Sequence, residues 1–86
     1  MHLPPTLSAE TLRAVFRTSL SVGLEGLRTS GMRRMVLAEN GRRLMAMVEA
    51  QELPPGRAGE AEAQRAFIAA QLRAVIDELE GEIQDD

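Results

Sequence analysis

The stretch EAQRAFIAAQLRAVIDEL, residues 62–79, presents two apolar faces when it is wound as an α-helix. Large side chains occupy one face: Ile68, Leu72, Val75, Ile76 and Leu79. Alanines and one phenylalanine occupy the opposite face: Ala63, Ala66, Phe67, Ala70 and Ala74. A surface helix of a globular protein normally carries a single apolar stripe. The second face of this helix therefore needs a cover from elsewhere.

The stretch belongs to a long helix predicted over residues 60–83, and another helix is predicted over residues 9–28. In the earlier segment, large apolar side chains recur at spacings of three and four, which is typical of a helix with one buried face. Ser8 stands where it can cap this helix. Ser19 and Gly23 lie on the same apolar stripe, four residues apart, where small residues are expected to let another helix approach closely.

Two breaks separate the helices. The first is RTSG, residues 28–31, in which Gly31 supplies backbone freedom and Thr29 or Ser30 supplies the next cap. The second is LPPGRAGE, residues 53–60, in which two prolines and two glycines predict a loop. These breaks leave a middle helix between them.

The middle helix, predicted over residues 32–52, is the least regular because its apolar face changes beside Asn40-Gly41. Asn-Gly is a strong turn signal. We predict one helix with a distortion there, and the alternative is a break that makes two short helices. Since Gly41 shares a face with large apolar residues, Gly41→Ala is expected to cost more than about 1 kcal/mol.

These segments predict an all-α fold, a bundle of three helices, or four if the middle one breaks. Residues 1–86 form one domain, with an extended lead-in at residues 1–7 and a frayed acidic tail at residues 84–86. A chain this short buries only about 60–65% of its unfolded surface and usually needs a further source of stability. It has no cysteine, which excludes disulfides, so self-association remains.

We therefore predict a homodimer in which the long C-terminal helices pair between chains. The residues assigned to this pairing are Ile68, Leu72, Val75, Ile76 and Leu79. The alternative is a monomeric three-helix bundle in which the middle helix slots between the other two.

Catalytic chemistry finds no support in the sequence. His2 is the only histidine, so no internal base can activate a serine, and no Glu-x-x-His pair or phosphate-binding glycine motif is present. We therefore expect no enzymatic activity, no metal and no cofactor. The first ten residues have neither a basic start nor an apolar core, and no segment reaches the roughly 20 apolar residues of a membrane span, so we expect a cytoplasmic protein.

Charge is distributed unevenly along the chain. Residues 1–59 hold eight arginines against five acids, whereas residues 60–86 hold two arginines against eight acids. The candidate residues for contact with a partner or with phosphate are Arg28, Arg33, Arg34, Arg42 and Arg43. We expect this arginine cluster to pair with acids of the last helix, in the same chain or in a partner chain, because no basic residue follows Arg73 at the negative end of that helix.

The sequence as a whole favours a small non-catalytic protein-protein interaction module, such as an adaptor, a regulator or an assembly subunit. Its predicted partners are a second copy of the chain and another protein. The alternative is a small nucleic-acid-binding regulator that uses the arginine cluster. The net charge of −3 and the absence of Tyr and Trp for base stacking weigh against that alternative.

Overall fold

The computed structural model describes residues 8–50 and 59–84 and places them in three helices. Helix α1 spans Ala9–Val22, α2 spans Ser30–Ala50 and α3 spans Glu60–Glu82. These described parts contain no strand, and the predicted all-α fold is confirmed. Four predicted parts lie outside the described residues: the lead-in at residues 1–7, the last two residues of the middle helix (51–52), most of the loop (53–58) and the last two residues of the tail (85–86).

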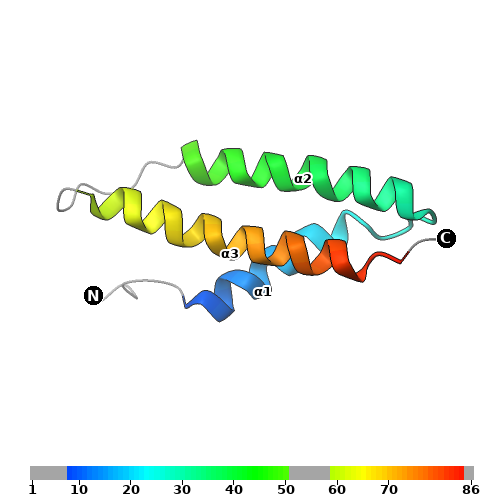
Figure 1. Cartoon of the computed structure of the whole chain (residues 1–86), viewed down its shortest axis with the longest axis horizontal. Coiled ribbons are helices and arrows are strands. Elements are labelled where there is room, and N and C mark those ends of the chain that lie inside the picture. The colour runs from blue at the N-terminus through cyan, green and yellow to red at the C-terminus, as the bar shows by residue number, and fades with distance from the viewer. Residues whose placement is uncertain (1–7, 51–58, 85–86) are drawn as a thin grey trace.

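Helix α3 lies at the centre of the arrangement (Figure 1), so the last helix lies between the other two, and not the middle helix as in the predicted monomeric bundle. It runs antiparallel to α2, and α1 crosses it obliquely (Figure 1). Both outer helices pack mainly on α3, and they contact each other little. The most deeply buried side chains come from all three helices: Leu20, Leu37, Leu72 and Val75. The bundle therefore depends on α3, because neither outer helix has another large surface on which to pack.

Helix α1 ends six residues before the predicted boundary at Arg28. After Val22 the backbone changes to tight turns, in which the Leu24 N–H donates to the Ser21 carbonyl at 3.0 Å. Gly26 then adopts a φ of +83°, a conformation that costs any L-residue with a side chain. Gly31, which we predicted to provide this freedom, lies inside α2 instead, so that prediction is wrong.

Substitution by alanine should change the free energy of unfolding in opposite directions at Gly26 and at Gly31. No atom lies within 4 Å of a Cβ built on either Gly26 or Gly31, so sterics do not contribute at either position. Gly26→Ala should lower the free energy of unfolding by about 1 kcal/mol because of its positive φ. Gly31→Ala should raise it by about 0.5 kcal/mol, since alanine favours helix. Urea unfolding followed by circular dichroism measures both, and equal effects of the two substitutions would contradict this assignment.

Helix α2 begins at a side-chain cap. The Thr29 hydroxyl accepts a hydrogen bond from the Met32 N–H at 3.1 Å, so one of the two predicted caps is confirmed. The helix then continues through Asn40-Gly41 without a break, so the middle segment is one helix and the four-helix alternative is wrong. The distortion that we predicted there is not seen, because both residues belong to the helix and Gly41 has no positive φ.

Asn40 and Gly41 occupy these positions because neighbouring helices approach closely there, and not because the chain turns. A Cβ built on Gly23 would lie 2.6 Å from Nδ2 of Asn40, so the end of α1 approaches this asparagine closely. A Cβ built on Gly41 would lie 2.9 Å from Cδ1 of Ile76 on α3. The two residues therefore face different neighbouring helices, which is why the apolar face of the sequence changes here.

The two apolar faces of α3 have different surroundings. On the face with large side chains, Leu72 and Val75 are 0% exposed, since α1 and α2 cover them within one chain. On the opposite face Ala63, Ala66 and Ala70 are exposed, and Phe67 is 42% exposed. No described residue of the same chain covers that second face. Within one chain, α1 and α2 therefore cover only the face of α3 with large side chains, and the face with alanines and Phe67 stays exposed.

Candidate functional site

The five arginines of the predicted cluster do not form one surface. Arg43 forms an ion pair of 2.9 Å with Glu39, one helical turn away on α2. Nε of Arg33 donates to the Leu27 carbonyl at 2.9 Å, and Arg28 is exposed beyond the end of α1. Only Arg34 and Arg42 contribute to a common cavity.

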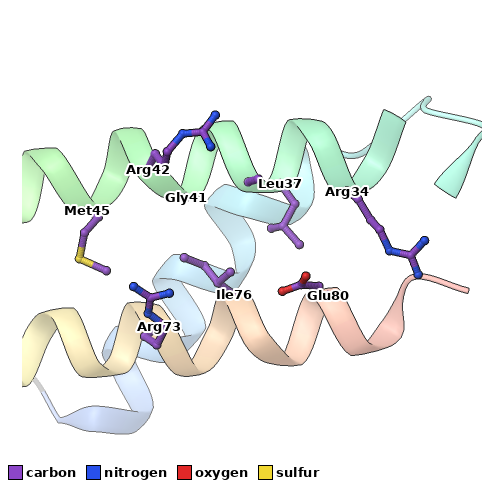
Figure 2. A pocket seen from close by; sticks show the side chains of 9 residues that line it. Arg34, Leu37, Gly41, Arg42, Met45, Arg73, Ile76 and Glu80 are labelled. Atoms are coloured by element: carbon purple, nitrogen blue, oxygen red, sulfur yellow. The ribbon is translucent and has the colours of Figure 1, made fainter. Parts of the chain in front are cut away.

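This cavity, the arginine groove, lies between α2 and α3 and has a volume of about 270 Å³. Its lining consists of Arg34, Leu37, Ala38, Gly41, Arg42, Met45, Arg73, Ile76 and Glu80. Figure 2 shows Met45 opposite Arg73 at one end and Arg34 near Glu80 at the other, while the guanidinium of Arg42 is directed away from α3. The centre of the groove is apolar because it is lined by Leu37 and Ile76. Ile76 packs against Gly41, which has no side chain to keep it away from α2. The groove thus combines an apolar middle with charged ends.

The charged residues of the arginine groove differ in whether they already have a hydrogen-bond or ion-pair partner within the chain. Nη2 of Arg34 donates to the Ile83 carbonyl at 3.2 Å, at the end of α3. By contrast, the side chains of Arg42, Arg73 and Glu80 have no hydrogen-bond or ion-pair partner among residues 8–50 and 59–84. All three are exposed. They remain available to charges that another molecule brings.

The acidic end of α3 is paired by a residue that the sequence reasoning missed. Nη2 of Arg17, on α1, contacts both carboxylate oxygens of Glu82, at 2.7 and 2.5 Å. The hydrogen bond to Glu82 is the main reason that the pKa of Arg17 is raised, and the charge of Glu82 adds to it. Because the pair is exposed, it contributes little to stability. Only the crossing of α1 over α3 brings these two residues together, and no local sequence signal marks them.

A second cavity, the apolar groove, lies between α1 and α2 with α3 as its floor. It measures about 620 Å³ and is lined by Leu12, Phe16, Leu44, Met47, Val48, Ala50 and Ile68. All of these side chains are apolar, and Met47 is 67% exposed. The groove exists because α1 and α2 diverge along α3, and the sequence could not reveal it since its lining comes from three helices.

The five residues predicted to pair between chains are divided by the structure. Leu72, Val75 and Leu79 are at most 5% exposed within a single chain, so they already have their packing partners. Ile68 lies in the apolar groove and Ile76 in the arginine groove. Only these last two are placed where a second chain could reach them.

One buried polar contact holds α1 on α3. Gln71 is 7% exposed, and its Oε1 accepts a hydrogen bond of 2.8 Å from Nε of Arg13. Satisfying this amide avoids the cost of a buried, unpaired polar group. The contact is structural and brings no reactive group to either groove.

No described helix has the length and apolar content needed to cross a membrane. Among residues 8–50 and 59–84, the two grooves and the exposed face of α3 are candidate surfaces for function. Comparison with known proteins finds no family model, curated protein or solved structure that matches this chain.

Proposed function

We propose that this chain is a small non-catalytic protein-protein interaction module that acts as a helical homodimer and binds another protein. The adaptor, regulator and assembly-subunit roles all require such a module. Each groove has a separate binding role. The arginine groove binds a second copy of the chain, and the apolar groove binds the apolar face of a helix from the partner protein.

The observation that carries this proposal is the apolar groove. This cavity measures about 620 Å³, and its described lining residues are all apolar and come from α1, the last two turns of α2 and one residue of α3. Amphipathic helices bind proteins by laying their apolar face into grooves of this kind. Met47 at the groove suits such contacts, because methionine adapts its shape to different partners.

Nucleic-acid binding has weaker support. Of the five clustered arginines, Arg33 and Arg43 already have contacts within the chain. Glu80 places a negative charge inside the arginine groove, where it repels a phosphate backbone. These contacts and this charge favour a protein partner over a nucleic acid.

The expected result for the wild-type chain is a molecular mass of about twice 9.4 kDa by light scattering after gel filtration. Met47→Glu should keep this mass and the helical signal but lose partner protein captured from native lysate, because a charge at the groove opposes an apolar helix. Glu49→Gln, an exposed change on the same helix, is the control.

A wild-type chain that remains monomeric at high concentration would remove the homodimer from the proposal. Tight binding of mixed-sequence duplex DNA, with a steep loss of affinity as salt increases, would place the nucleic-acid alternative first.

A further inference from the structure

We infer that a second copy of this chain docks on the arginine groove, with the two α3 helices antiparallel about a two-fold axis beside Ile76. In this arrangement Arg73 of each chain faces Glu80 of the other. The inference rests on the proposed homodimer and specifies its interface.

The order of residues along α3 supports this arrangement. Arg73 and Glu80 are seven residues apart, which is about two helical turns or 10 Å, so they lie on the same side of the helix. Ile76 lies between them, and all three line the arginine groove. Figure 2 shows their side chains extending from α3 toward α2. The surface therefore reads positive, apolar and negative along the helix.

A two-fold axis makes such a surface complementary to itself. In an isologous interface, a contact between residues i and j of two chains is always accompanied by the contact between j and i. An axis midway between Arg73 and Glu80 thus forms two Arg73–Glu80 pairs and brings the apolar centres together. A parallel arrangement would instead oppose like charges.

Helix α2 strengthens the charge complementarity. Arg42 lines the same groove from α2, and its guanidinium, which Figure 2 shows directed away from Arg73, has no partner among residues 8–50 and 59–84. It adds positive charge to the surface that the incoming carboxylate approaches, and Arg73 makes the direct contact. At the other end Arg34 already donates to the Ile83 carbonyl, and Glu80 receives the partner chain's arginine. A polyanion gains less here, because Glu80 has no cationic partner in it and opposes it.

Two charge reversals test the pairing. Arg73→Glu places like charges at both symmetric contacts, and so does Glu80→Arg. Each variant should raise the dissociation constant of the dimer roughly a hundredfold, since opposed like charges are strongly unfavourable at an interface. Both positions are exposed, so the far-UV circular dichroism spectrum should be unchanged.

Mixing the two variants restores complementarity. In a mixed dimer the introduced glutamate of one chain faces the introduced arginine of the other, and the native Arg73 and Glu80 face each other at the second contact. An equimolar mixture should regain the dimer mass in analytical ultracentrifugation at a concentration where each variant alone is monomeric. The pair Glu25→Arg and Arg28→Glu makes the same changes in net charge away from the groove. These controls should remain dimeric, both separately and when mixed.

The outcomes separate this inference from the proposed function. If the wild type and both groove variants are equally dimeric, the arrangement is wrong and the homodimer stands with another interface. If the two groove variants fail to recover the dimer when mixed, the Arg73–Glu80 pairing is wrong. If the wild type is monomeric, both the homodimer and this interface fall.

Discussion

Leu72→Glu is expected to unfold the chain at every protein concentration. The sequence alone allowed two results, an unfolded chain or a folded monomer, because it placed Leu72 between chains. In the structure Leu72 is 0% exposed and belongs to the same core as Leu20, Leu37 and Val75. A carboxylate there has no partner, and burying it costs several kcal/mol, comparable to the whole stability of a small domain.

Far-UV circular dichroism and a urea titration measure this effect. Ala70→Glu introduces the same side chain on an exposed part of α3 and should leave the helical signal intact. Leu72→Ala should lower the free energy of unfolding by about 2–5 kcal/mol through the cavity it creates. A Leu72→Glu protein that is monomeric and fully helical would show that this residue belongs to an interface and not to the core.

Gly41→Leu is expected to have the second-largest effect, a loss of about 3 kcal/mol in the free energy of unfolding. Gly41 is buried where α2 meets α3, and even a Cβ at this position would lie 2.9 Å from Cδ1 of Ile76. The larger side chain must push the two helices apart, whereas the same change at exposed Gly31 meets no atom within 4 Å of its Cβ. Chemical denaturation of both variants measures the difference.

Gly41→Ala should have a much smaller effect than we expected from the sequence. Gly41 has helical backbone angles, so alanine gains about 1 kcal/mol of helix propensity. The opposing contact is the tip of Ile76, a flexible side chain, so a net change within about 1 kcal/mol follows. Removing Cδ1 with Ile76→Val should make Gly41→Ala more favourable than in the wild type. Additive effects of the two substitutions would contradict direct contact between these residues.

Some helix boundaries could be predicted from residues close to them in the sequence, and one could not. The start of α1 after Ser8 and the cap at Thr29 follow from side-chain hydrogen bonds within three residues of each boundary. The start of α3 at Glu60 follows from the left-handed backbone of Gly59 and the acidic residues of the first turn. The end of α1 could not be predicted in this way. The apolar spacing continues to Leu27, but the helix stops at Val22 because the chain must turn toward α2, and Gly26 permits that turn.

The candidate surfaces were predicted less well than the helices. The arginine cluster was defined by closeness in sequence, yet the groove joins Arg34 and Arg42 to Arg73, which lies on another helix. The pair between Arg17 and Glu82 likewise joins residues 65 positions apart. Such neighbours depend on the directions in which helices cross, and one helical segment contains no information about that.

The sequence by itself determined that the chain forms three helices and that α3 has two apolar faces, because periodicity and capping are properties of single segments. Only the tertiary structure decided which face is covered. α1 and α2 both pack on the face with Leu72 and Val75, since large side chains there remove more apolar area from water than the alanines opposite. The same choice left Ile76 beside Gly41 in an open groove, where the proposed second chain meets both apolar surface and exposed charge.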